Sequence, residues 1–333
     1  MSPPPLNMAA IRYGIAGTPV EQSLSPLLTA LVADHLGLFR SEKKLSMELV
    51  NVASIHDALA WGYAGAVPSP IDWVYTQAVF GKFRTKALLE KAVKGAALVE
   101  VEDPHLTTDH PLLAERSPEP LSGLPTRMFD EEIWVNLTAP LKHQLDTSAV
   151  MCLDDSMATK SVNALRWDGK GWWCCGVDGE GVLSVLLHHG IDPKKHVLGL
   201  VGGGGAARST ASAWARNEGR IHTLESKRAL ENGPWDEHLT DQRPDFIVDF
   251  DGTWKHDGDM LVLTSAYEAL LGDYDARIES LLGPSLNGRW MLVAQHLACW
   301  SQLWAPELAE HLPSLPLLLT RLVEAELTLA SYA

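Results

Sequence analysis

The sequence predicts an α/β protein built from two domains. Its 333 residues exceed the size that one hydrophobic core usually serves. In the second half, residues 197–201 predict a buried strand, four glycines follow, and residues 209–217 have helical spacing closed by Gly219. Strand, glycine turn, helix and strand in this order form the βαβ unit of a doubly wound parallel sheet. The remaining elements expected in this half are strands at 221–224, 246–250 and 261–264 and helices at 291–303 and 315–330.

The first half predicts a second α/β domain. Residues 11–16 predict a short buried strand, and residues 26–38 predict a helix with Ser25 as its cap and Pro26 at its first position. Proline-rich stretches farther along indicate irregular surface loops. The other elements expected in this half are strands at 45–52 and 134–137 and a helix at 85–97.

The composition excludes several classes of function. A formal net charge of −15 without a long basic run disfavours nucleic acid, because a polyanion would be repelled. No stretch is apolar over the ~20 residues that a membrane span needs. We therefore expect a cytoplasmic protein that binds a small molecule, without nucleic acid or membrane as a partner. The cysteines predict reduced thiols and no metal site, because their spacing fits neither a disulfide framework nor a CxxC motif: Cys152, Cys174, Cys175 and Cys299.

The glycine-rich loop GGGGAAR lies between a predicted strand and a predicted helix. Without Cβ atoms, the backbone can turn sharply and let a pyrophosphate approach the N–H groups and the positive dipole end of the helix. The alternative is a flexible glycine turn, because the spacing departs from the standard GxGxxG fingerprint. The flanking elements favour a Rossmann-like domain with NAD or NADP as cofactor, bound by Gly202, Gly203, Gly204, Gly205, Ala206 and Arg208.

The choice between NAD and NADP is usually made about 20 residues beyond such a loop. A carboxylate at Glu225 can accept hydrogen bonds from a ribose diol, and it repels a 2′-phosphate. Lys227 and Arg228 act in the opposite direction. The balance favours NAD slightly.

Six motifs in the same chain order resemble those of the shikimate/quinate dehydrogenase family, along most of the chain. The glycine loop resembles that family's Gly-Ala-Gly-Gly-Ala-x-Arg. The other matches are YGIAGTPVEQSLSP with Ser23 and Ser25; VNLTAPLKH with Asn136, Thr138, Pro140 and Lys142; KSVNAL with Asn163; CCGVDGEG with Asp178, Gly179 and Gly181; and GRWMLVAQ with Gly288, Met291, Leu292 and Gln295.

The resemblance implies an N-terminal α/β substrate-binding domain and a Rossmann-like doubly wound dinucleotide-binding domain, with the active site in the cleft. The substrate-binding domain spans residues 10–182 and is completed by C-terminal helices within 291–333. The domain that binds NAD(P) spans residues 183–290. An insertion around 53–127 exceeds what the family normally shows. We expect it to pack beside the substrate-binding domain and to alter oligomer contacts, such as those of a homodimer.

The resemblance also implies the interconversion of 3-dehydroshikimate and shikimate, or of the quinate pair, with a cyclic hydroxy acid as substrate. Lys142 and Asp178 are the implied catalytic pair. An ammonium can stabilise charge on a carbonyl oxygen and donate a proton, while the carboxylate holds it in place. Gly288 joins the cofactor-binding set, and the implied substrate-binding residues are Ser23, Ser25, Thr138, Asn163, Asp178 and Gln295.

Several positions depart from the family's motifs. Gly176 and Val177 replace the Asn and Thr before the aspartate, and Gln22 replaces a His. The family's Asn-Arg-Thr motif for the adenosine phosphate is absent, which weakens the case for NADP. Its later Tyr-x-Pro segment is also missing, and Tyr267 is the nearest candidate for that tyrosine.

Two other functions stay open. The first is a metabolite-binding regulator, which keeps the substrate-binding residues but does not catalyse a reaction. The presence of Lys142 argues against it, because a sensor needs no proton donor. A dehydrogenase of another hydroxy acid is the second alternative. Taken alone, each site residue also has an ordinary structural role. A lysine is usually a surface charge, and an Asp in a DGxG sequence usually forms a turn. Ser23 and Ser25 would usually be helix caps.

Overall fold

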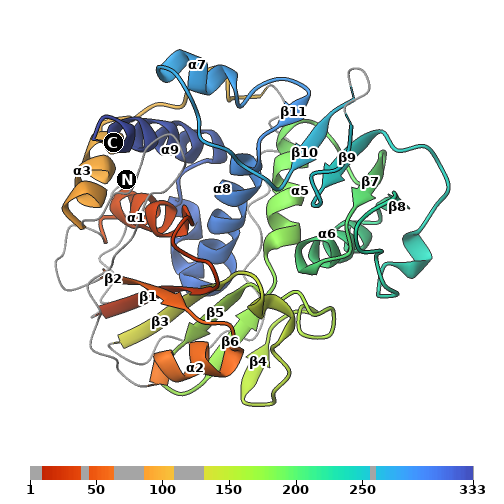
Figure 1. Cartoon of the computed structure of the whole chain (residues 1–333), viewed down its shortest axis with the longest axis horizontal. Coiled ribbons are helices and arrows are strands. Elements are labelled where there is room, and N and C mark those ends of the chain that lie inside the picture. The colour runs from red at the N-terminus through yellow and green to blue at the C-terminus, as the bar shows by residue number, and fades with distance from the viewer. Residues whose placement is uncertain (1–9, 39–44, 64–85, 109–130, 256–259, 333) are drawn as a thin grey trace.

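The part of the chain that the structure describes contains two β-sheets, with helices packed between and around them (Figure 1). The computed structural model describes residues 10–38, 45–63, 86–108, 131–255 and 260–332. In Figure 1 the first sheet lies at the lower left and the second at the right, with helices α5 (Asp178–His188) and α8 (Gly288–Cys299) between them. The expected fold class, an α/β protein with a Rossmann-like doubly wound sheet, is confirmed.

The first sheet has six strands in the order β2-β1-β3-β5-β6-β4. Strand β1 is parallel to β2 and β3, while β5 is antiparallel to β3 and β6. The three strands expected here are confirmed, whereas β4, β5 and β6 were not expected, because three or four residues are too short to show a period. The strands are β1 (Ala10–Gly17), β2 (Leu45–Asn51), β3 (Glu131–Leu137), β4 (Val150–Cys152), β5 (Ala164–Trp167) and β6 (Trp172–Cys175).

The second sheet has five strands in the order β11-β10-β9-β7-β8, and all neighbouring strands are parallel. Strand β8 lies on one side of β7 and β9 on the other, so the chain reverses direction across the sheet at β7. Ligands of doubly wound sheets bind at the carboxyl ends of the strands at such a point. The strands are β7 (Val197–Val201), β8 (Arg220–Thr223), β9 (Phe246–Asp249), β10 (Val262–Thr264) and β11 (Ser285–Leu286).

Helix α6 (Gly205–Arg216) begins within the glycine loop, earlier than the expected start at residue 209. A π-helical turn (Trp300–Trp304) continues α8. No helix in the described ranges is both long and apolar enough to cross a membrane. The other helices are α1 (Ser25–His35), α2 (Ile55–Tyr63), α3 (Lys86–Ala96), α7 (Tyr274–Glu279) and α9 (Leu315–Ala330), and the 3₁₀ turns are η1 (Leu141–His143), η2 (Asp236–His238) and η4 (Pro306–His311).

The expected insertion around 53–127 is described only in part. It includes α2 and α3, while residues 64–85 and 109–130 lie outside the described residues. Helix α3 packs against α1 and α9. The expected domain boundary at residue 182 falls inside α5, and an effect of the insertion on oligomer contacts stays a prediction.

Helix α8 carries a histidine into the protein interior. His296 is 0% exposed and lies beside Trp304, whose indole stacks on Trp134 of β3. Neither of its ring nitrogens has a hydrogen-bond partner within the described part of the chain. Burial lowers the pKa of His296 to about 3, so the folded protein holds this imidazole neutral.

We predict a pH-dependent loss of stability that originates at His296. Between pH 6.5 and about 3 the unfolded chain protonates this imidazole and the folded chain does not, so stability falls as the pH falls. In this range the wild type should lose about 1.4 kcal/mol per pH unit more than His296→Leu does. Urea denaturation at several pH values measures the difference, with His56→Leu as the control for an exposed imidazole. Identical slopes for wild type and His296→Leu would refute the prediction.

Candidate active site

A cavity of about 580 Å³ lies between the two sheets. The ends of β1 and β3, the residues after β9 and the first turns of α6 and α8 border it. It therefore lies at the carboxyl edge of both sheets, where the chain reversal at β7 places a ligand. Every residue expected to bind substrate or to catalyse lines this cavity: Ser23, Ser25, Thr138, Lys142, Asn163, Asp178 and Gln295.

Lys142 and Asp178 form an ion pair in this cavity, with 2.6 Å between Nζ and Oδ2. The 3₁₀ turn η1 after β3 carries the lysine, and Asp178 is the first residue of α5. The side chain of Asp178 is 0% exposed and that of Lys142 is 23% exposed. The carboxylate is therefore interior, while the ammonium reaches the cavity. The positive end of the α5 dipole also favours a negative charge here.

Asn163 holds the second oxygen of Asp178. Its Nδ2 donates to Oδ1 of Asp178 at 2.7 Å, and its own Oδ1 accepts the backbone N–H of Val177 at 2.8 Å. Both carboxylate oxygens therefore receive a hydrogen bond, which a buried charge needs to remain stable. The residue before β5 and the start of α5 are fixed to each other in this way.

Ser23 and Ser25 lie where the loop after β1 leads into α1. Leu24 occupies the N-cap position, Ser25 is already helical, and no side chain caps the helix. The expected cap role of Ser25 is therefore wrong. The Ser23 hydroxyl accepts the N–H of Ser25 at 3.2 Å, and both side chains line the cavity.

Asn136, at the end of β3, lines the cavity although the motif analysis assigned it no role. Its Oδ1 accepts a hydrogen bond from Tyr13 at 2.8 Å, and its Nδ2 donates to the sulfur of Cys299 at 3.5 Å. Burial raises the pKa of both Tyr13 and Cys299, so these groups stay protonated and the amide keeps one orientation. The motif VNLTAPLKH contained this residue, but only the fold brings its two partners to it.

The start of α6 fits the pyrophosphate of a dinucleotide. A Cβ on Gly204, the N-cap residue, would have no neighbouring atom within 4 Å. Gly204, Gly205 and Ala206 line the cavity, and the first N–H groups of a helix have no acceptor within the helix. Open space beside such N–H groups is what a phosphate requires. The donors and the space for this cofactor are therefore both present.

Among the other expected cofactor-binding residues, only Gly288 belongs to the described wall of this cavity. Arg228 also lines the cavity, but the described wall does not include Gly202, Gly203, Arg208 or Glu225. Arg208 instead donates hydrogen bonds to the carbonyl oxygens of Gly203 at 3.2 Å and of Lys160 at 2.9 Å. The structure thus brings four of the expected cofactor-binding residues together at the cavity: Gly204, Gly205, Ala206 and Gly288.

The glycine at position 176, where the family's motif has an asparagine, has a steric cause. A Cβ at this position would stand 2.7 Å from the Cβ of Ser156 and 2.9 Å from the carbonyl oxygen of Ser161. The N–H of Gly176 donates to Oδ2 of Asp154 at 2.8 Å. The segment after β4 therefore fills the space that a side chain at 176 would need, and it fixes the chain just before Asp178.

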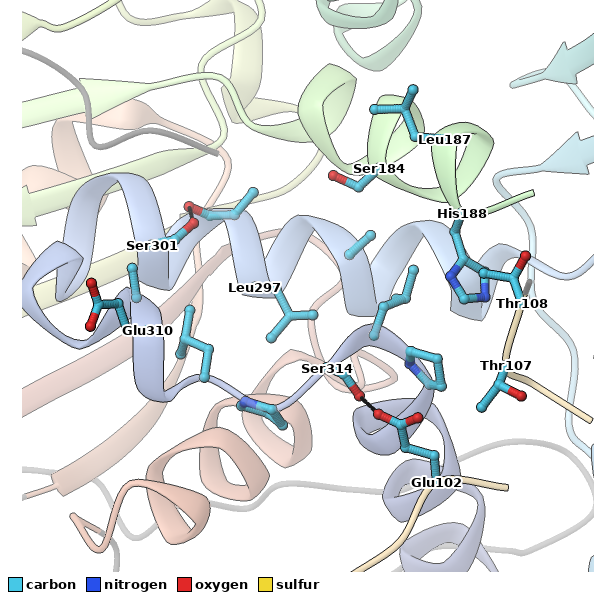
Figure 2. A pocket seen from close by; sticks show the side chains of 17 residues that line it. Glu102, Thr107, Thr108, Ser184, Leu187, His188, Leu297, Ser301, Glu310 and Ser314 are labelled. Carbon is cyan, nitrogen blue, oxygen red and sulfur yellow. Dashed lines mark hydrogen bonds between the residues drawn. The ribbon is translucent and has the colours of Figure 1, made fainter. Parts of the chain in front are cut away.

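A second cavity, of about 410 Å³, lies on another face of α8 (Figure 2). Its wall includes Ser184 and His188 of α5, and Glu102, whose carboxylate contacts Ser314. No residue expected to catalyse or to bind substrate lines it within the described ranges. Those ranges also hold no cluster of His, Cys, Asp and Glu suited to a metal ion. The first cavity is therefore the candidate active site.

Sequence comparison finds local similarity to curated enzymes. The chain is 33% identical over 73 residues to a shikimate dehydrogenase (NADP(+)) of Methylibium petroleiphilum, and 32% identical over 95 residues to one of Stenotrophomonas maltophilia. The matches cover 22% and 28% of this chain, and they span only 25% and 34% of the length of the two relatives. No protein-family profile matches the chain.

Comparison with solved structures shows that the chain shares its fold with known enzymes over most of its length. Shikimate 5-dehydrogenase from Thermus thermophilus in complex with shikimate gives a TM-score of 0.53 at 17% identity, covering 93% of this chain and 97% of that one. The same enzyme in complex with NADP(H) and shikimate gives 0.52 at 17% identity, covering 94% and 99%. The chain therefore shares the fold of these enzymes, and short stretches of its sequence are similar to those of curated shikimate dehydrogenases.

Two glycine substitutions should affect stability differently. A Cβ on Gly203 would meet the carbonyl oxygen of Ala229 at 2.1 Å, so Gly203→Ala should cost about 1–3 kcal/mol through backbone displacement. Gly204→Ala should change stability by no more than about 0.5 kcal/mol, because its site is open and the loss of an N-cap glycine is offset by a less flexible unfolded chain. Denaturant unfolding of both variants measures this. Equal losses of stability in the two variants would contradict the difference in packing between Gly203 and Gly204.

Proposed function

We propose that the protein is an NAD(P)-dependent oxidoreductase that interconverts 3-dehydroshikimate and shikimate. One observation carries the proposal: the buried Asp178 carboxylate holds the Lys142 ammonium at the wall of a cavity that also contains Gly204, Gly205 and Ala206 at the start of α6. We call these three residues the dinucleotide cradle. The quinate pair is the second substrate candidate, because it presents the same carboxylate and similar ring hydroxyls.

The residues of the chain supply the proton chemistry and the positioning. A dinucleotide bound at the start of α6 supplies the hydride. In the direction of reduction, Nζ of Lys142 donates a proton to the carbonyl oxygen, where negative charge builds up. In oxidation the neutral amine accepts that proton. Asp178 and Asn163 fix the lysine before substrate binds, which lowers the entropic cost of reaching the reactive geometry.

The polar side chains of the cavity suit a cyclic hydroxy acid. Ser23 and Ser25 can donate their hydroxyl hydrogens to a carboxylate at the start of α1. Thr138, Asn163 and Gln295 offer uncharged donors and acceptors to ring hydroxyls. Such partners discriminate well, because a substrate that lacks one hydroxyl leaves a buried polar group unpaired.

We propose NADP as the cofactor, in place of the slight preference for NAD that Glu225 suggested. The matched curated relatives are named for NADP(+), and the Thermus enzyme has been solved with NADP(H). In this chain Arg228 lines the cavity, whereas Glu225 does not belong to its described wall. A guanidinium near the ligand space favours a 2′-phosphate.

The direct test is a matrix of initial rates with shikimate and quinate, each with NAD⁺ and NADP⁺. We expect turnover of shikimate with NADP⁺ as the highest of the four values. If shikimate bound tightly but no combination gave turnover, the protein would be a metabolite-binding regulator and not an enzyme. If neither acid were turned over but another hydroxy acid were, the proposed substrate would be wrong and the proposed type of reaction would stand.

Lys142→Ala tests the catalytic role within the same assay. Loss of the proton donor should lower kcat by about 10²–10⁴-fold. The dissociation constant for shikimate should change far less, because the serine and amide contacts remain. A kcat within a few fold of the wild type would refute the assignment of Lys142.

A further inference from the structure

Helix α6 contacts two segments outside its own sheet. One is the stretch from Asp155 to Lys160, between β4 and β5, and the other is the start of α5. Three of the α6 side chains that make these contacts are Arg208, Ser212 and Arg216. They are spaced four residues apart, so they lie on one face of the helix.

Arg216 joins both segments to the last turn of α6. Its Nη1 donates to Asp155 at 2.9 Å, and its Nη2 donates to Glu180 of α5 at 2.7 Å. The Ser212 hydroxyl donates to the other oxygen of the Asp155 carboxylate. Asp155 therefore receives two donors from α6, although it belongs to the first sheet's part of the chain.

Arg208 makes the corresponding connection at the first turn of α6. Only 6% of this residue is exposed, and its guanidinium bridges the carbonyl oxygens of Gly203 and Lys160. The glycine loop and the segment before Asn163 are thus held by one side chain. A Cβ built on Gly205 would lie 3.4 Å from the Cβ of Lys142 and 3.5 Å from the carbonyl oxygen of Lys160.

The backbones of α5 and α6 also meet next to Asp178. The N–H of Gly179 donates to the Ser209 hydroxyl at 2.9 Å, and a Cβ on Gly179 would stand 2.1 Å from the carbonyl oxygen of Ser209. The helix that starts at the dinucleotide cradle is therefore in direct contact with the helix that carries the catalytic carboxylate.

We propose that Arg208, Ser212 and Arg216, together with Asp155, form a clamp that sets the position of the start of α6 relative to the Lys142–Asp178 pair. These are positioning residues, and the inference rests on the proposed function. Its consequence is specific: affinity for the nucleotide depends on Asp155, a residue that lies outside the dinucleotide-binding sheet and does not line the described cavity.

Asp155→Ala is the variant that tests the clamp. We expect kcat/KM for NADP⁺ to fall by about fivefold, mainly through a higher KM, which is the size expected for partly exposed charges with 34% and 44% exposure. The dissociation constant of shikimate, measured without nucleotide, should stay within twofold. Asp155→Asn, which keeps an acceptor for Ser212, should show a smaller defect. The double variant Asp155→Ala/Arg216→Met should be no worse than the poorer single variant.

Lys194→Met is the matched control, because it removes an exposed ion pair with Glu218 from the same part of the chain. It should leave both KM values and kcat unchanged, and thermal unfolding should show that all variants are folded. An unchanged KM for NADP⁺ in Asp155→Ala would overturn the clamp, as would an equal loss of shikimate affinity. If the wild type itself bound no nucleotide by calorimetry, the proposed function would fail, and the clamp with it.

Discussion

The fold removes the carboxylate of Asp178 from water, and the rest of the site supplies the partners that a buried carboxylate needs. The carboxylate is 0% exposed, so it depends on the Lys142 ammonium, the Asn163 amide and the positive end of the α5 dipole. These donors come from three separate stretches of the chain. The 3₁₀ turn after β3, the residue before β5 and the first turn of α5 must all be in place before the charge is stable.

The same requirement links the two sheets. Asp178 begins α5, and α5 packs on α6 so closely that Gly179 has no room for a side chain. Helix α6 in turn begins at the open cradle formed by Gly204 and Gly205. The Lys142–Asp178 pair and the start of α6 are therefore parts of one packed unit. A cleft between two domains can bring its reacting groups together only if such contacts hold them in register.

Much of the fold and of the candidate site could be predicted from the sequence. The strand, glycine loop and helix that begin at Val197 show a strong local pattern, and α9 was predicted with its observed bounds. Features that depend on distant contacts could not be predicted. The hydrogen bonds of Asn136 to Tyr13 and Cys299, and that of Arg208 to the carbonyl oxygen of Lys160, join residues far apart in sequence. Spacing beyond the glycine loop selected Glu225, which does not belong to the described wall of the cavity, and its role toward a cofactor stays a prediction.

The central claim is that Lys142, held by Asp178, protonates a carbonyl oxygen while a hydride arrives from a dinucleotide. Hydride transfer itself can be followed with NADPH carrying two deuterium atoms at C4, incubated with 3-dehydroshikimate. We predict that mass spectrometry and NMR will find one deuterium on the ring carbon that carries the new hydroxyl group, and at most about one hundredth as much labelled product within the same time for Lys142→Ala. Recovery of unlabelled, unreduced 3-dehydroshikimate from the wild-type protein with both compounds bound would contradict the account.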